Sequence, residues 1–174
     1  MSFLNKIKQG LGIGTLEAKL NVPGQIAGNS GQFEGDFILT AKSDQQIKEV
    51  RVKFEMVRRW DETKHRRVSN GKRQSYTSQE SQTFELGNYI DNTPFEMKAS
   101  EVKTVHFAIP FQMINPQSPV DAAIGQGGVS AVLGTISKLT SIMRNERVDY
   151  KVEGKVDLKD VAFDPSDSKN IIVT

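Results

Sequence analysis

The sequence contains no cysteine and only two histidines, His65 and His106, among its 174 residues. The absence of cysteine excludes disulfide bonds, thiolate metal sites and cysteine nucleophiles. The scarcity of histidine removes most histidine-rich metal chemistry. No apolar run approaches the roughly 20 residues that a membrane-spanning helix needs, and the residues after Met1 do not build the apolar stretch of a secretory signal. We therefore expect a cytoplasmic protein without a cofactor, a metal or a transmembrane segment.

Strong charge of one sign is also lacking. The chain has 23 basic and 21 acidic residues and a formal net charge of +2, so overall charge indicates neither a histone-like binder nor an acidic tail. Hydrophobic residues make up 37% and charged residues 25%, which is typical of a folded globular protein. The length and the absence of an internal repeat predict a single domain over residues 1–174.

Most of the chain follows the two-residue period of half-buried strands. The clearest strand places Val50, Val52, Phe54 and Met56 on one face and charged residues on the other. The same period recurs over residues 16–22, 33–41, 105–111 and 148–158. Asn70-Gly71 suits a tight turn, which predicts a long hairpin with a polar tip outside the core. Seven or so short strands predict an all-β fold, a two-sheet antiparallel sandwich.

Two segments follow the period of a helix instead. Phe3, Leu4, Ile7 and Leu11 predict a short N-terminal helix. Residues 115–145 predict a glycine-rich loop and an inserted helix, which we expect to pack on the sandwich, on a second copy or on a partner. The apolar stripe of this interaction helix comprises Val129, Val132, Leu133, Ile136, Leu139, Ile142 and Met143.

Positive charge is concentrated in one part of the predicted hairpin. Seven basic residues face two acidic ones there; the basic patch comprises Arg58, Arg59, Lys64, Arg66, Arg67, Lys72 and Arg73. Guanidinium and ammonium groups bind phosphates, so this patch is a candidate site for nucleic acid or an acidic lipid surface. A solvated hairpin whose charges prevent edge-to-edge aggregation is the more ordinary interpretation.

Catalytic and metal-binding patterns are weak. The sequence has no G-x-S-x-G elbow, and neither histidine lies in a nucleophile signature, so we expect no enzyme activity. His106 is out of phase with the apolar face of its strand, which predicts a surface position. Asp157, Asp160, Asp164 and Asp167 offer carboxylates to a cation, but their spacing matches no EF-hand loop. The segment 164–167, Asp-Pro-Ser-Asp, favours a type I turn.

Three segments resemble the bacterial sporulation-control proteins of the arrestin-like superfamily. Met1-Ser2-Phe3 followed by Gly12-Ile13-Gly14 resembles the start of that family. Residues 156–167, VDLKDVAFDPSD, followed by Ile171-Ile172-Val173, resemble the end of its first sandwich domain. Pro94-Phe95 and residues 102–111 resemble its apolar strand that ends on a proline. The resemblance covers residues 1–111 and 148–174, whereas the insertion at 115–145 departs from it, and family members commonly continue into further sequence.

The resemblance implies an arrestin-like, immunoglobulin-like β-sandwich with the helical insertion as an addition. It also implies a non-enzymatic intracellular scaffold, adaptor or regulatory module that binds other proteins. An anion-surface binder that uses the hairpin 58–73 is the alternative. A homo-oligomer also stays open at this point.

Overall fold

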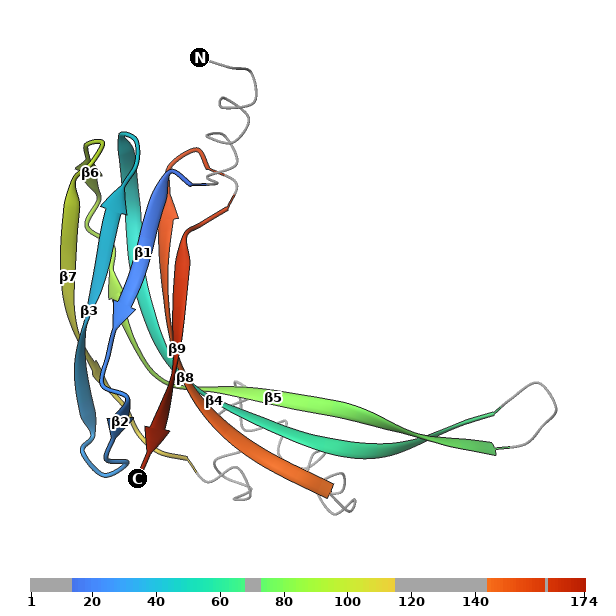
Figure 1. Ribbon diagram of the computed structural model, residues 1–174. Coiled ribbons are helices and arrows are strands. Elements are labelled where there is room, and N and C mark those ends of the chain that lie inside the picture. Colours follow the sequence, from blue (N-terminus) through green and yellow to red (C-terminus); the bar gives the residue numbers. More distant parts are fainter. Residues whose placement is uncertain (1–13, 68–72, 115–143, 162) are drawn as a thin grey trace. The chain divides into compact units, whose positions relative to one another are not determined.

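A computed structural model describes residues 14–67, 73–114, 144–161 and 163–174 of the chain (Figure 1). These residues form strands and no helix, so none of them belongs to a helix that could cross a membrane. The two predicted helices fall in residues 1–13 and 115–143, outside the described residues, as does Asn70-Gly71. The strands are β1 (Leu16–Asn21), β2 (Gln25–Ile26), β3 (Gln32–Ala41), β4 (Gln45–Arg67), β5 (Arg73–Asp91), β6 (Phe95–Met97), β7 (Val102–Pro110), β8 (Arg144–Leu158) and β9 (Ser166–Val173).

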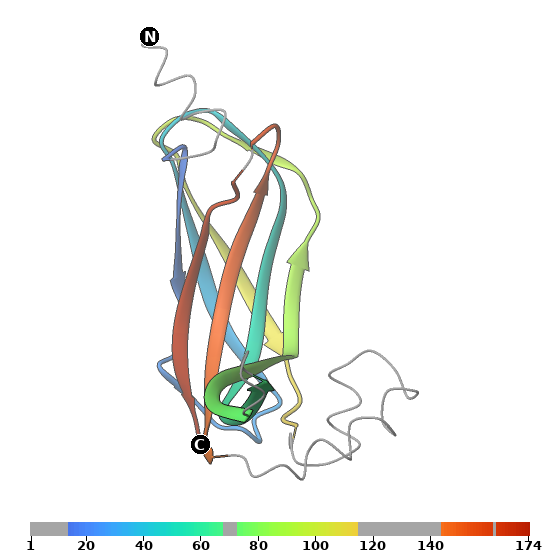
Figure 2. The ribbon, with the colours of Figure 1, turned by 90° about the vertical axis from the view of Figure 1, so that its right-hand side faces the viewer.

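The strands form two sheets, as the sequence predicted. The smaller sheet has the order β1-β3-β7, and both of its pairings are antiparallel. The larger sheet has the order β2-β9-β8-β4-β5, and β6 pairs with β4. Figure 2 shows β9, β8, β4 and β5 side by side. β2 and β9 pair in parallel, so the prediction of a purely antiparallel fold is wrong at this edge. A strand of two residues has no alternation that a sequence could reveal.

Two boundaries also differ from the sequence prediction. β8 begins at Arg144, so the last residues of the predicted insertion 115–145 form strand instead. β9 begins at Ser166, so the predicted type I turn at residues 164–167 is wrong. The Val156 N–H donates a hydrogen bond of 3.0 Å to the Pro165 carbonyl. This bond extends the pairing of β8 and β9 through the proline, which leaves no room for a turn there.

The chain divides into two compact units. The first comprises Met1–Glu55, Leu86–Met113 and Tyr150–Thr174, and the second comprises Met56–Glu85 and Ile114–Asp149. β4, β5 and β8 each contribute residues to both units.

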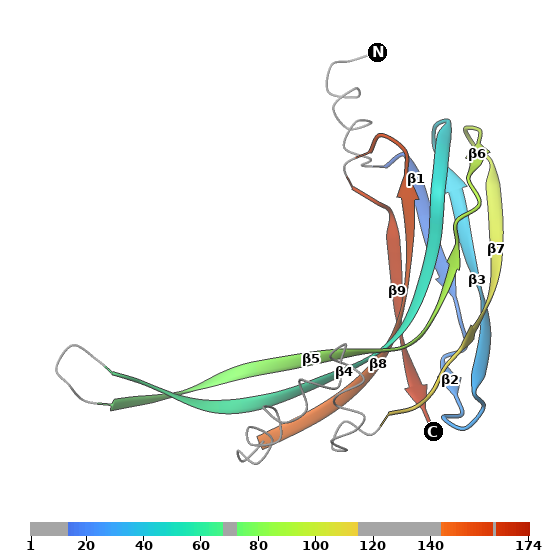
Figure 3. The same ribbon diagram turned by 180° about the vertical axis from the view of Figure 1, so that it is seen from behind.

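The first unit is a β-sandwich with an aromatic core. The smaller sheet and the larger sheet form two layers (Figures 1 and 3). Phe33 of β3 packs edge-on against Phe54 of β4 with ring centroids 5.4 Å apart, and Phe54 meets Phe111 at 5.2 Å. The predicted inward faces of β3, β4 and β7 are confirmed, because their apolar residues are buried. Burial of this apolar surface is the main force that holds the sheets together.

The second unit contains residues 56–67 of β4, 73–85 of β5 and 144–149 of β8. Met56 and Phe84 are fully buried. The described residues 74–77 of β5 are exposed, and the predicted tip of the hairpin at residues 68–72 lies outside the described residues. The side chain of Tyr76 in this part of β5 is exposed.

Candidate functional site

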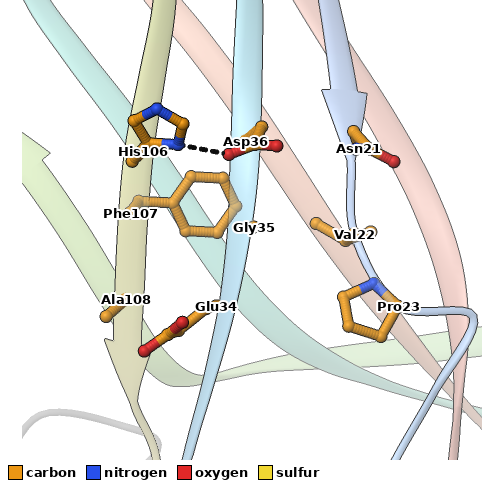
Figure 4. Close-up of a pocket in the computed structure, with 9 residues that line it drawn as sticks. All are labelled: Asn21, Val22, Pro23, Glu34, Gly35, Asp36, His106, Phe107 and Ala108. Atoms are coloured by element: carbon orange, nitrogen blue, oxygen red, sulfur yellow. Dashed lines mark hydrogen bonds and ion pairs between the residues drawn. The ribbon is translucent and has the colours of Figure 1, made fainter.

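A hollow of about 730 Å³ lies in the first unit, where β1 ends beside β3 (Figure 4). Residues from β1, β3 and β7 and from the segment after β1 form its walls. We call it the β3 hollow; it is lined by Asn21, Val22, Pro23, Glu34, Gly35, Asp36, His106, Phe107 and Ala108.

The hollow exists because β1 leaves its sheet early. The pairing of β1 with β3 ends at Asn21 opposite Asp36. Pro23 follows and has no N–H to continue a ladder of hydrogen bonds. The chain then enters β2, which belongs to the larger sheet. No part of β1 therefore lies opposite residues 32–35 of β3.

The backbone of Glu34 opens toward this gap. The Leu20 N–H donates to Oδ2 of Asp167 at 2.8 Å, so the polar groups of Leu20 point away from β3. The backbone N–H and C=O groups of successive residues in a strand point to opposite sides, so those of Asn21 point toward β3. Asp36 is the partner of Asn21, and its backbone N–H and C=O point toward β1. Glu34 lies two residues before Asp36, so its backbone N–H and C=O also point toward the β1 side of β3. β1 provides no hydrogen-bonding partner for them there.

Charged side chains stand on the outer face of β3 beside this gap, and Figure 4 shows them directed toward β7. Nδ1 of His106 lies 2.6 Å from Oδ1 of Asp36, and the two residues are paired across β3 and β7. The His106 side chain is 81% exposed, which confirms its predicted surface position. Glu34 is exposed and lies opposite the small side chain of Ala108. Among the described residues, the Glu34 carboxylate makes no hydrogen bond or ion pair.

The floor of the hollow is apolar and tightly packed. A Cβ atom at Gly35 would lie 2.7 Å from the Phe107 ring and 2.9 Å from the Asn21 carbonyl oxygen. Real contacts are longer, so the site requires glycine. The Phe107 ring also lies 6.1 Å from the ring of Tyr89, between centroids. The ring of Phe107 is therefore held in place beneath the carboxylates.

The side chains of the hollow define the chemistry that it offers. Its nine lining residues include an aspartate beside a histidine and a second carboxylate, and no serine, threonine, cysteine or lysine. Within the described ranges, no three metal-ligating side chains converge. Two carboxylates, an apolar floor and an open backbone remain as the chemical features of the hollow.

The basic patch predicted from the sequence lies along β4 and at the start of β5, in the second unit. Arg58 is only 2% exposed, and its Nε lies 2.5 Å from Oε1 of Glu146 in β8. Its guanidinium group also stands 5.4 Å from the centre of the Trp60 ring. Arg58 is thus part of a buried ion pair and is not available to a ligand.

Two further cations of the patch are paired with carboxylates. Arg59 pairs with Asp149, and Lys64 pairs with Glu80. The hydrogen bond to Glu80 raises the pKa of Lys64 above its ordinary value, and the same bond lowers the pKa of Glu80. Arg66 is exposed. Lys72 and the side chains of Arg67 and Arg73 lie outside the described residues, as does the whole apolar stripe of the predicted interaction helix.

The acidic residues near the end of the chain do not form a cluster. Asp157 pairs with Lys48 at 3.7 Å, Asp164 with Lys155 at 3.0 Å, and Asp167 with Lys169 at 3.5 Å. Asp160 adopts a positive φ of 60° in the turn after β8. Each carboxylate that pairs does so with a different lysine.

Analysis of the sequence missed the β3 hollow. Glu34 and Asp36 are separated from His106 by about seventy residues, and their meeting depends on the register of β3 and β7. One signal was present: both carboxylates alternate with the inward residues Phe33 and Phe37, so they occupy the same outward face.

Comparisons with known proteins establish the fold. No known family matches this sequence, and no curated protein is similar to it in sequence. A solved structure that is similar is Spo0M, a sporulation control protein from Bacillus subtilis, with a TM-score of 0.52 and 13% sequence identity. The similarity covers 92% of this chain and 50% of that chain, so this chain spans half the length of the solved structure. The sandwich therefore has a fold like that of a sporulation control protein.

Proposed function

We propose that this chain is a non-enzymatic, arrestin-like module that binds other proteins as an intracellular scaffold, adaptor or regulator. In this proposal residues 1–174 act as one module, and the insertion forms a helix that ends before β8 begins at Arg144. The observation that carries the proposal is the interrupted pairing of β3, which leaves the Glu34 backbone open beside a hollow. Unpaired strand edges are sites where extended segments of other proteins add to a sheet.

The fold gives this proposal further support. The similar solved structure is described as a sporulation control protein, which is a regulatory role. At 13% identity the similarity shows the fold, and the role is part of the present proposal.

Affinity capture from the native cell, followed by mass spectrometry at low and high salt, tests the proposal. We expect a defined set of proteins to stay bound at high salt, because apolar and backbone contacts are screened little by ions. The same chain unfolded before coupling to the matrix is the control. Loss of every captured protein at high salt, or equal capture by the unfolded control, would contradict the proposal.

The alternative, an anion-surface binder, has less support because Arg58, Arg59 and Lys64 already hold carboxylates. Its test replaces Arg66, Arg67, Lys72 and Arg73 by glutamine and compares retention on heparin at low salt. We expect similar, weak retention of both proteins. Strong retention of the wild type that the variant loses would favour the alternative, since neutralised phosphates or sulfates release counterions.

A further inference from the structure

Resting on the proposed role in protein binding, we propose that the β3 hollow receives a cationic side chain, arginine or lysine, from a partner polypeptide. Three features of the hollow point to this ligand: its two carboxylates, its apolar floor and the open backbone at its edge.

The carboxylates provide the charge for such a ligand. Glu34 and Asp36 are two residues apart in β3, so their side chains emerge on the same face. Asp36 uses Oδ1 to bind His106, and Glu34 has no partner among the described residues. A guanidinium or ammonium group carries several N–H donors and no acceptor, so it can satisfy these oxygens together.

The apolar floor of the hollow suits the aliphatic stem of an arginine or lysine, and the open backbone of Glu34 suits the backbone of that residue. Arginine and lysine carry an apolar stem below the charged group, and such stems lie along apolar surface. Val22, which is half-buried, and Pro23, which is exposed, offer that surface in the lining of the hollow, and the buried Phe107 ring packs beneath them. The N–H and C=O of Glu34 face the gap left by β1, where an extended partner backbone can pair with them.

An organic cation fits this site better than a metal ion. Metal ions gather several ligand atoms at about 2.0–2.6 Å. No such group of three or more ligating side chains converges in the part of the chain that the structure describes. A long cationic side chain does not need several ligand atoms around one point, because its N–H donors can reach two carboxylates that stand apart.

Titration of the isotope-labelled protein with a blocked valine–arginine–valine tripeptide, followed by nuclear magnetic resonance of the backbone amides, tests the inference. We expect saturable shifts at Glu34, Gly35, Asp36 and His106 with a dissociation constant of about 1 mM, as suits one side chain and a short backbone. The same tripeptide with citrulline in place of arginine is isosteric and uncharged, and it should bind at least about threefold more weakly.

Glu34→Gln is the informative variant, because its exposed side chain can change without loss of the fold. We expect it to bind the arginine tripeptide about three- to tenfold more weakly. Glu17→Gln, which alters an exposed glutamate on β1 of the same sheet, is the matched control and should bind as the wild type does. Absence of shifts at the hollow up to about 10 mM peptide, or equal binding by Glu34→Gln and Glu17→Gln, would overturn the inference.

The titration tests the cation site and the affinity capture tests the protein-binding role, so a failure of one can be told apart from a failure of the other. If proteins are captured at high salt but the tripeptide leaves the hollow unaffected, the inference is wrong and the protein-binding role stands. If the tripeptide binds at the hollow but no protein is captured, the cation site stands and the proposed role is contradicted.

Discussion

Single residues decide how closely the strands of the sandwich approach. A Cβ atom on Gly154 of β8 would lie 2.8 Å from the ring of Phe37 in β3, which is itself fully buried. The two sheets thus meet where glycine allows a phenylalanine ring to rest on the backbone. Interiors are packed as densely as organic crystals, so one added methyl group has nowhere to go.

Gly154→Ala should therefore destabilise the protein by about 1–3 kcal/mol through overpacking. Gly24→Ala is the matched control, because nothing lies within 4 Å of the Cβ atom that it adds. Urea unfolding of both variants measures the difference. Equal stability of Gly154→Ala and Gly24→Ala would mean that Phe37 does not pack on Gly154.

Phe54 is the centre of the aromatic core. It is fully buried, and its ring meets those of Phe33, Phe111 and Tyr150. We expect Phe54→Ala to cost about 3–5 kcal/mol, through lost burial and the cavity left behind. Lys53→Ala, on the opposite face of β4, should cost much less. Denaturant melts that show equal losses would contradict the register of β4.

At the scale of elements, a carboxylate links β9 to the edge of β1. Burial raises the pKa of Asp167, but hydrogen bonds from the Leu20 and Ser168 N–H groups and the charge of Lys169 outweigh it, and the pKa is lowered. A lowered pKa in the folded state adds stability above the unfolded pKa, near 3.9, and this stability is lost as pH falls through the folded pKa.

Asp167→Asn should accordingly destabilise the protein at neutral pH, and the difference from the wild type should shrink as pH falls below about 4. Thermal melts between neutral pH and about pH 3 measure it. Asp157→Asn, which removes a carboxylate half exposed beside Lys48, is the comparison and should change stability little. A gap between wild type and Asp167→Asn that widens in acid would contradict the assignment.

A buried ion pair joins β4 to β8 in the second unit. Arg58→Ala leaves Glu146 without its partner at a position where Arg58 is 2% exposed, so we expect a loss of about 3–5 kcal/mol. Arg59→Ala breaks a neighbouring pair that is nearly half exposed and should cost about 0–1 kcal/mol. Hydrogen exchange of β4 and β8 amides, together with urea melts, compares the two. Similar losses would show that Arg58 is not buried in solution.

The sequence predicts the strands well where alternation is long. The inward faces of β3, β4 and β7 follow from apolar residues at every second position. The pairing of Arg58 with Glu146 could not be predicted in this way, because it depends on which distant strand lies beside β4. The sequence alone therefore places Arg58 in the basic patch, as a candidate ligand of anions. The β3 hollow likewise depends on the residue at which the pairing of β1 with β3 ends. The alternation of apolar and polar residues does not show where that pairing ends.

At the scale of the whole molecule, one predicted surface lies outside the described residues. The sequence predicts that the apolar stripe from Val129 to Met143 is covered by this molecule, a second copy or a partner. If a second copy covers it, Leu133→Asp with Ile136→Asp should convert an oligomer into a folded monomer. Analytical ultracentrifugation at micromolar concentrations measures this, and a wild type that is already monomeric would exclude self-association through the stripe.

The parallel pair of β2 and β9 has a consequence for how the molecule is made. β9 lies between β2 and β8, and β2 pairs through Gln25 and Ile26 with Ile172 and Val173, which follow far later in the sequence. On the ribosome, β2 is complete long before its partner strand has been synthesised. Chains that depend on such distant contacts fold slowly, in milliseconds to seconds. The larger sheet therefore closes late, and until then the nascent chain exposes an edge that chaperones can protect.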